Sequence, residues 1–268
     1  MTIRSETRDA VTIVTIDRPD ARNAVNPAMA TALYEAFLAF EADGSQRVAI
    51  LTGVPGAFCA GFDLKAAAAG MDDGWFARHA IGDDWDNPAS SPRPGPMGPT
   101  RLLLSKPVIA AISGAAVAGG MELALWCDLR VMEASAYMGV YCRRWGVPLI
   151  DGGTVRLPRI VGQGRAMDLI LTGREVKADE CLAMGLATAV APDGAALQAA
   201  LELAGTLARF PQSTMRADRM SALTQWGKDP AAALANEWKS LETFTRDGVG
   251  GAARFSAGKG RGGRFDDL

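Results

Sequence analysis

The chain has 268 residues, of which 49% are hydrophobic and 22% are charged, a composition typical of a globular protein with a sizeable core. Its formal net charge of −2 argues against binding through a basic surface, so we expect no nucleic-acid partner. The four cysteines form no C-x-x-C pair, which argues against a zinc site or a disulfide framework and predicts reduced thiols in a cytoplasmic protein.

The first part of the chain predicts a strand hairpin, a helix and a further strand. Residues 11–16 alternate and are rich in β-branched side chains, so we expect a strand that pairs with residues 2–6. An Asn-Pro pair opens the stretch 26–41, which is typical of an N-cap and first helical residue and predicts a helix there. The apolar run 48–52 predicts a short buried strand.

A glycine-rich loop and an irregular segment come next. Residues 53–65 predict the end of a strand, a glycine-rich loop and a return into a helix over 65–69. Residues 70–100 contain five prolines and several glycines, so we expect a mobile insertion that forms a lid or a pocket wall. The single histidine, His79, lies in this segment and is most simply a surface residue.

The stretch 106–130 predicts the centre of the molecule. Gly119 and Gly120 precede a short helix expected over 121–127. The N–H groups of a first helical turn have no internal acceptor, and the helix dipole there favours negative charge. Gly119 is therefore a candidate to donate an N–H to an anion or to a developing oxyanion. Glu122 lies in the same turn and is either a capping residue or a carboxylate held beside that anion site.

The rest of the chain continues the alternation of strands and helices and becomes mainly helical, which predicts an α/β fold. The glycine- and arginine-rich residues 248–268 predict a flexible basic tail. Strands are expected over 108–112, 129–132 and 185–190, and helices over 155–161, 164–171, 178–184, 195–209 and 211–246.

Several common functions lack their motifs. The sequence has no G-x-G-x-x-G after the first strand, no Walker loop and no G-x-S-x-G elbow, which argues against dinucleotide, nucleoside-triphosphate and serine-hydrolase sites. The first nine residues contain no apolar segment, so we expect no signal peptide. The most apolar run, 107–121, is shorter than the roughly 20 residues of a membrane span, so we expect no membrane association.

Two of the glycine-rich segments, at their spacing, resemble the crotonase family, the enoyl-CoA hydratase/isomerase superfamily. Residues 57–64 (Ala-Phe-Cys-Ala-Gly-Phe-Asp-Leu) are similar to its first oxyanion-hole motif. Residues 118–130 (Ala-Gly-Gly-Met-Glu-Leu-Ala-Leu-Trp-Cys-Asp-Leu-Arg) are similar to its second. The likeness continues through the segments 16–24, 152–162, 171–173 and 183–186 and covers nearly the whole chain except residues 70–100 and the last dozen.

The resemblance implies an α/β fold with two parts. Residues 1–200 would form a crotonase-like spiral core of repeated ββα units that binds acyl-CoA and carries out catalysis. Residues 201–268 would form a helical oligomerisation region, with a basic tail, that mediates trimers or dimers of trimers. The substrate would be an acyl-CoA thioester, so coenzyme A arrives with the substrate and no other cofactor or metal is implied.

The resemblance also implies roles for individual residues. The backbone N–H groups of Phe62 and Gly119 would bind the thioester oxygen and stabilise an enolate. Aromatic residues and the histidine would shape the acyl pocket, namely Trp75, His79, Trp85, Tyr141 and Trp145. The residues at CoA-binding positions are Arg22, Ala24, Ala60, Lys65 and, reaching from a neighbouring subunit, Lys259.

The sequence departs from the family pattern at one catalytic position. Hydratases of the family use two glutamates; Glu122 matches the first, but Cys142 stands at the second. Asp151 lies where dienoyl-CoA isomerases and aryl-CoA dehalogenases have an active-site aspartate, so Glu122 and Asp151 are the expected catalytic pair. The structural alternative for Asp151 is a cap on the next helix. Cys142 is expected to be a small buried residue rather than a nucleophile.

The main hypothesis from the sequence is an acyl-CoA-processing lyase, similar to an enoyl-CoA hydratase, that stabilises a thioester enolate. The first alternative is another crotonase reaction through Glu122 and Asp151: enoyl- or dienoyl-CoA isomerisation, thioester hydrolysis, decarboxylation or dehalogenation. The second alternative is a catalytically weak protein on the same fold that binds acyl-CoA or RNA.

Overall fold

A computed structural model describes residues 2–71 and 73–263, and the chain divides into two compact units. Unit 1 contains Met1–Ala204 and unit 2 contains Gly205–Leu268. All strands of the described residues lie in unit 1, whereas unit 2 is helical. The division between the units and the boundary expected near residue 200 both fall within helix α8 (Ala196–Arg209).

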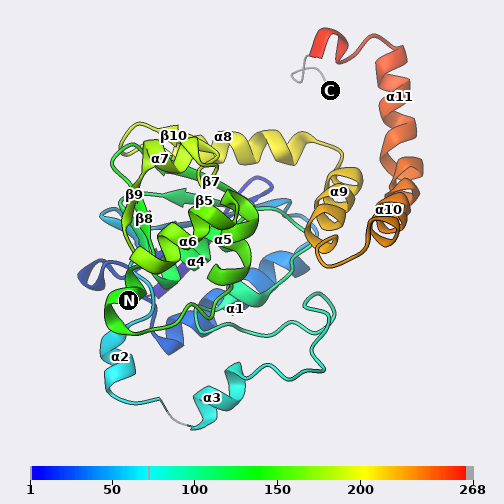
Figure 1. Ribbon diagram of the computed structural model, residues 1–268. Helices are drawn as coiled ribbons and strands as arrows, with labels where there is room; N and C mark the ends of the chain where they lie inside the picture. Colours follow the sequence, from blue (N-terminus) through cyan, green and yellow to red (C-terminus); the bar gives the residue numbers. More distant parts are fainter. Residues whose placement is uncertain (1, 72, 264–268) are drawn as a thin grey trace. The chain divides into compact units, whose positions relative to one another are not determined.

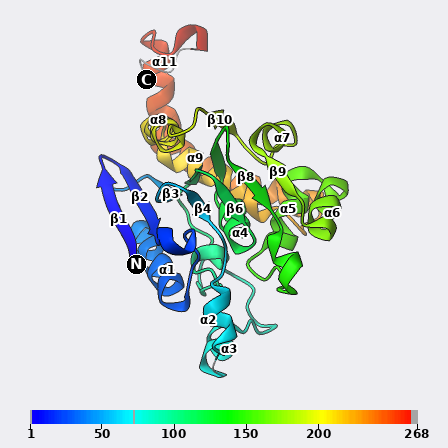
Figure 2. The ribbon, with the colours of Figure 1, turned by 90° about the vertical axis from the view of Figure 1, so that its left-hand side faces the viewer.

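The strands of unit 1 form two sheets, visible from two directions in Figures 1 and 2. The larger sheet has the order β1-β2-β3-β5-β7-β10 and the smaller has the order β4-β6-β8-β9. The strands are β1 (Thr2–Arg8), β2 (Val11–Asp17), β3 (Val48–Gly53), β4 (Ala57–Cys59), β5 (Val108–Ile112), β6 (Ala115–Val117), β7 (Leu129–Glu133), β8 (Tyr137–Gly139), β9 (Glu175–Lys177) and β10 (Ala189–Ala191).

Successive strands alternate between the two sheets. The pairs β3/β4, β5/β6 and β7/β8 each send their first strand to the larger sheet and their second to the smaller one. Within each sheet these six strands run parallel to one another, whereas β9 pairs antiparallel with β8. Because the next helical segment follows each pair, the expected spiral of ββα units is confirmed.

The burial and the length of a strand explain whether it could be predicted from the sequence. Every residue of β3 and β5 is buried, as expected for parallel strands covered on both faces, so their sequences are continuous apolar runs. The hairpin of β1 and β2 forms with Ile3 opposite Ile16. The strands β4, β6, β8 and β9 are three residues long, too short to show an alternation, and were not expected.

The first long helix of unit 1 begins at a side-chain cap. Asn26 accepts a hydrogen bond from the Met29 N–H at 2.9 Å and caps α1, which confirms that N-terminus. Helix α4 begins at Gly119, two residues earlier than expected. The helices are α1 (Pro27–Ala42), α2 (Leu64–Ala68), α3 (Asp73–His79), α4 (Gly119–Trp126), α5 (Gly153–Val161), α6 (Gln163–Thr172), α7 (Ala178–Ala183) and α8, with 3₁₀ turns η1 (Pro19–Ala21), η2 (Pro99–Arg101) and η3 (Tyr141–Trp145).

The segment 70–100, expected to be a mobile insertion that forms a lid or a pocket wall, has regular structure in two places and does line a cavity. Residues 73–79 form helix α3. Residues 95–100 are buried, and the backbone N–H and carbonyl groups of Gly95 and Gly98 bond reciprocally at 2.8 Å. Proline and glycine here specify a tight turn rather than mobility, because the turn packs against the rest of the core.

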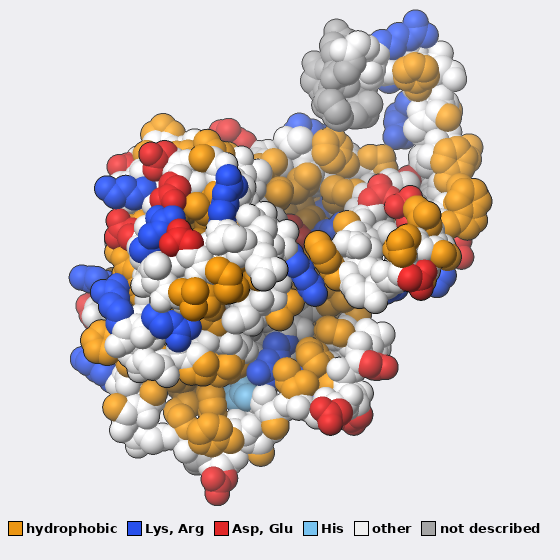
Figure 3. Space-filling model, in the orientation of Figure 1, with side chains coloured by type: hydrophobic (Ala, Val, Ile, Leu, Met, Phe, Trp, Pro, Cys, Tyr) orange, Lys and Arg blue, Asp and Glu red, His pale blue; other side chains and the backbone are white. Residues whose placement is uncertain are grey.

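Unit 2 is helical well beyond the expected end at residue 246. The expectation of a flexible tail is wrong for residues 249–256, which form α11, and residues 264–268 lie outside the described residues. Large hydrophobic side chains are exposed along this unit, including Trp226, Trp238 and Phe255 (Figure 3). Its elements are α9 (Gln212–Thr224), α10 (Pro230–Trp238), η4 (Lys239–Thr243), the π-helix η5 (Phe244–Gly248), α11 (Val249–Ser256) and η6 (Arg261–Gly263). No helix among the described residues is both long and apolar enough to cross a membrane.

One glycine sets the distance between β4 and α4. A Cβ atom at Gly120 would collide with the carbonyl oxygen of Cys59, the last residue of β4. Backbone atoms cannot move aside as a flexible side chain can, so this approach requires glycine. The short strand and the first turn of the helix are thereby held in contact.

We predict that Gly120→Ala destabilises the protein by about 3 kcal/mol, because the new methyl group forces the two backbones apart. Urea denaturation measures this change in the free energy of unfolding. Gly44→Ala is the control, since a Cβ atom there meets nothing within 4 Å, and it should change stability by less than about 0.5 kcal/mol. Equal stability of the two variants would contradict the requirement for glycine at position 120.

Candidate active site

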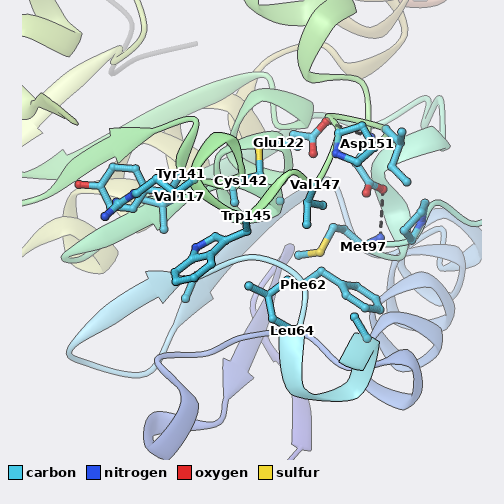
Figure 4. Close-up of a pocket in the computed structure, with 18 of the residues that line it drawn as sticks. Phe62, Leu64, Met97, Val117, Glu122, Tyr141, Cys142, Trp145, Val147 and Asp151 are labelled. Carbon is cyan, nitrogen blue, oxygen red and sulfur yellow. Dashed lines mark hydrogen bonds between the residues drawn. The ribbon is translucent and has the colours of Figure 1, made fainter. Parts of the chain in front are cut away.

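Unit 1 encloses a cavity of about 550 Å³, shown in Figure 4. Its acidic lining residues are Glu122 and Asp151, which lie on one side, while Phe62 and Leu64 lie on the other. The remaining lining is mostly apolar: Ala60, Ala67, Met71, Trp75, Phe76, Pro96, Met97, Val117, Ala118, Gly119, Tyr141, Cys142, Trp145, Val147, Pro148 and Ile150, with Arg22 and Arg144. A mostly apolar cavity with a few convergent polar groups is typical of a small-molecule site.

The two expected oxygen-binding N–H groups meet at this cavity. Phe62 follows β4 and Gly119 is the first residue of α4, and both line the cavity. Among the hydrogen bonds of the described residues, none uses the N–H of Phe62 or of Gly119. A Cβ atom at Gly61 would lie 2.9 Å from the Gly119 nitrogen, so a glycine next to Phe62 lets the two segments approach.

The residue before Gly119 has an unusual backbone conformation. Ala118 has φ 52° and ψ −125°, a combination that side chains other than glycine rarely adopt. Its N–H is fixed by the carbonyl oxygen of Gly139 at 2.9 Å. Strain of this kind persists only where the surrounding structure enforces it, and it is concentrated at functional sites.

The Glu122 carboxyl is anchored by one of its two oxygens. Its Oε1 accepts the backbone N–H of Asp151 at 2.9 Å and that of Gly153 at 2.8 Å. These donors lie at the start of α5, so Glu122 does not cap its own helix. A Cβ atom at Gly153 would lie 2.9 Å from Oε1, which explains the glycine there. Neither of these bonds uses the other oxygen, Oε2.

The Asp151 carboxyl has the same arrangement. Its Oδ1 accepts the Met97 N–H at 3.0 Å and the Thr100 hydroxyl. The N-cap of α5 is Gly152 and makes no side-chain cap, so the capping alternative for Asp151 is wrong. Both carboxyl groups therefore keep one oxygen, Oε2 or Oδ2, that these anchoring bonds do not use.

Burial makes two ionised carboxylates in this place costly. Burial, together with the Asp151 carboxyl, raises the pKa of Glu122 from 4.5 to about 7. Burial also raises the pKa of Asp151, although hydrogen bonds from Thr100 and Met97 and the charge of Arg101 oppose this. The pair is thus suited to hold one proton at neutral pH.

Cys142 lines the same cavity but is not activated. It is buried, and burial together with the Glu122 carboxyl raises the pKa of its thiol. A nucleophilic cysteine needs a lowered pKa, so the expectation of an unreactive side chain fits this environment. Within residues 2–71 and 73–263, no three histidine, cysteine or acidic side chains are grouped to hold a metal ion.

The expected CoA-binding residues fall into two groups. Arg22, Ala24 and Lys65 line a second, more open cavity of about 550 Å³ that shares Arg22 with the first. Ala60 lines the first cavity, and its N–H bonds the Arg22 carbonyl at 3.0 Å. Lys259 lies in unit 2, so unit 1 does not bring it to these four residues.

Of the aromatic residues and the histidine expected to shape the acyl pocket, some line the first cavity and others do not. Trp75, Tyr141 and Trp145 line the first cavity. His79 packs on Trp75 with ring centroids 4.5 Å apart, and Trp85 donates to the Ser91 carbonyl; neither is among the described residues lining the cavity. Sequence reasoning missed Met97 and Thr100. The glycines and prolines of their segment, Gly-Pro-Met-Gly-Pro-Thr, indicate a turn. That this turn contacts Asp151 is visible only in the folded chain.

Comparison with known proteins identifies relatives over most of the chain. A sequence profile described as enoyl-CoA hydratase/isomerase matches residues 6–95 and 97–248. An enoyl-CoA hydratase of Mycobacterium tuberculosis is 39% identical over 209 residues, covering 75% of this chain and 73% of that protein. A mevalonyl-coenzyme A hydratase of Beauveria bassiana is 36% identical, covering 81% and 76%. The crystal structure of an enoyl-CoA hydratase from Mycobacterium marinum superposes with a TM-score of 0.84 at 35% identity, covering 95% of each chain.

We predict that Glu122→Gln stabilises the protein at alkaline pH. A carboxyl group whose pKa rises on folding from 4.5 to about 7 loses folding free energy as the pH rises through this range, and the loss is constant above it. The variant should therefore be about 3 kcal/mol more stable than wild type at pH 8 and nearly equal to it at pH 4. Denaturation curves across this range test the prediction, and a stability difference independent of pH would contradict it.

Proposed function

The chain belongs to the enoyl-CoA hydratase/isomerase family, and we propose that it is an enzyme that adds water across the 2,3 double bond of a 2-enoyl-CoA thioester. The relatives named above support this activity, since they are described as hydratases acting on CoA esters. The site supports it through one observation: two buried carboxyl groups line the cavity, and each has one oxygen that its anchoring bonds do not use. The cavity is also lined by Phe62 and Gly119, whose N–H groups make no hydrogen bond among the described residues.

In the proposed reaction, the N–H groups of Phe62 and Gly119 bind the thioester oxygen. Negative charge develops on that oxygen when a hydroxyl group adds to the β-carbon, and donors already in place stabilise it without reorganising. Of the pair Glu122 and Asp151, one carboxylate takes a proton from the attacking water and the other carboxyl gives its proton to the α-carbon. The pair begins and ends with one proton, so the reaction balances and reverses through the same groups.

Double-bond isomerisation is the second candidate, and Cys142 favours it. The cysteine replaces the second glutamate of the hydratase pattern, which removes a carboxyl group that could position water. Isomerisation moves a proton between carbon atoms and needs no water molecule. The same enolate, the same N–H groups and the same pair of carboxyl groups would carry it.

We propose that the two adjoining cavities of unit 1 bind the substrate together. The thioester and acyl group would occupy the cavity with Glu122, while Arg22 and Lys65 in the second cavity would bind the CoA phosphates. Arginine and lysine are suited to phosphate recognition. The adenosine end would also meet Lys259 of a neighbouring subunit.

Self-association is part of the proposal. The exposed large side chains of unit 2, such as Trp238 and Phe244, would be covered in a trimer or a dimer of trimers. The four free, buried cysteines suit a reducing compartment, which supports the cytoplasm. Sedimentation of the purified chain would test the oligomer.

We predict that wild-type protein hydrates crotonyl-CoA, observed as loss of the conjugated enoyl absorbance. Glu122→Gln and Asp151→Asn should each lower kcat by about 10² to 10⁴-fold because each removes an acid/base group, while binding of the CoA ester persists. Cys142→Ala is the control and should stay within about 10-fold of wild type.

Three outcomes separate the candidates. Full activity of Asp151→Asn would contradict its role in the pair. Bound but unreacted crotonyl-CoA in wild type would contradict hydration of this substrate, and turnover of 3-enoyl- or dienoyl-CoA esters would then support isomerisation. Binding without turnover of any enoyl ester would favour a binding protein.

A further inference from the structure

We propose that Thr100 is a positioning residue that fixes the Asp151 carboxyl and decides which of its oxygens carries the proton. This inference rests on the proposed function, because it assigns how one member of the catalytic pair is held. Thr100 does not line the cavity, whereas Asp151 does, so the threonine would act through the aspartate.

Both donors to Asp151 come from one tight turn. The reciprocal bonds between Gly95 and Gly98, each 2.8 Å, close the turn and aim the Met97 N–H at Oδ1, 3.0 Å away. Thr100 follows in η2, and its hydroxyl donates to the same Oδ1. Because the Met97 N–H can only donate and the Thr100 hydroxyl donates to the same oxygen, a proton on Asp151 is favoured on Oδ2.

The hydrogen bond from Thr100 is enclosed on all sides. Thr100 is 1% exposed and Asp151 is 3% exposed. A Cβ atom at Gly95 would lie 2.5 Å from Oδ1 and would also collide with the Thr100 hydroxyl, so the space is filled. Loss of the hydroxyl would therefore leave Oδ1 with one donor, the Met97 N–H, in a buried place, which disfavours the carboxylate.

The half-buried side chain of Arg156 fixes the backbone on both sides of this bond. Arg156 of α5 donates from Nη2 to the Thr100 carbonyl at 2.6 Å and from Nη1 to the Asp151 carbonyl at 3.0 Å. The turn and the segment before α5 thus share one donor group, and Thr100 and Asp151 cannot move apart independently. The hydroxyl adds the contact that reaches the carboxyl group itself.

The same turn also reaches the oxygen-binding group. The Met97 side chain packs on Gly119, where a Cβ atom would lie 2.7 Å from the Met97 sulfur. The backbone of Met97 holds Asp151, while its side chain lies against the residue whose N–H would bind the thioester oxygen. The turn therefore sets the position of the acid relative to the oxyanion site.

The ionisable groups that act on Asp151 come from four elements. They are Glu122 of α4, Arg156 of α5, Arg101 of η2 and His79 of α3. None is changed by substituting Thr100. Removing the hydroxyl takes away a donor that favours the carboxylate, so the pKa of Asp151 should rise further and protonation of the pair should begin at higher pH.

The test compares Thr100→Val, Thr100→Ser and Thr100→Ala by kcat, KM and the pH profile of hydration. The hydroxyl-free variants should lose about 10- to 100-fold in kcat, the value of a hydrogen bond to a charged group, with KM changed less than about 3-fold. Their acid limb should move upward by about 1 pH unit. Thr100→Ser should retain both the rate and the profile within about 3-fold.

The serine and alanine variants lack the same methyl group and differ only in the hydroxyl, so they decide the question even if the valine variant does not fold. Equal rates and equal pH profiles of serine and alanine would overturn the positioning role. Asp151→Asn, measured alongside, separates the two claims. Full activity of Asp151→Asn would refute the role of Asp151 in the proposed pair, whereas its inactivity with an alanine variant like wild type would refute only the role of Thr100.

Discussion

Two carboxyl groups buried at one cavity are the constraint on which this site depends. Burial raises the pKa of Glu122 and of Asp151, and the Asp151 carboxyl adds to the rise at Glu122, so the pair is suited to retain a proton near neutral pH. Each carboxyl is also held by two donors on one oxygen. The raised pKa values therefore favour a proton on the pair, and the hydrogen bonds favour the oxygen of each carboxyl that has no donor.

The fold assembles this pair from segments that are distant in sequence. The ββα repeats place the end of β4, the start of α4 and the start of α5 around one cavity. Hydrogen bonds then link them: Glu122 in α4 receives the N–H groups that begin α5, and Asp151 receives donors from the 95–100 turn. Close backbone approaches at Gly61 and Gly120 make these distances possible. A shift of any one segment would change the distances between the two carboxyl groups and the N–H groups of Phe62 and Gly119.

The sequence predicted the parts of the site that depend on local chemistry. The glycines beside Phe62 and before Glu122 indicated the two loops of the site, and the apolar runs indicated β3 and β5. Each of these patterns lies within a few residues. The role of Thr100 could not be predicted, because the partner of its hydroxyl lies 51 residues away. The turn at 95–100 was taken as mobile because proline and glycine are common in both loose loops and tight turns, and only its burial distinguishes them.

Direct titration of the Glu122 carboxyl tests the central claim. Carbon-13 labelling of glutamate side chains allows their carboxyl signals to be followed by NMR from pH 4 to pH 9, with Glu122→Gln to assign the signal. We predict one glutamate that titrates at about pH 7 and is missing from the variant. If instead the signal lost in the variant titrates below pH 5, the buried pair does not share a proton, and the proposed acid/base mechanism is wrong.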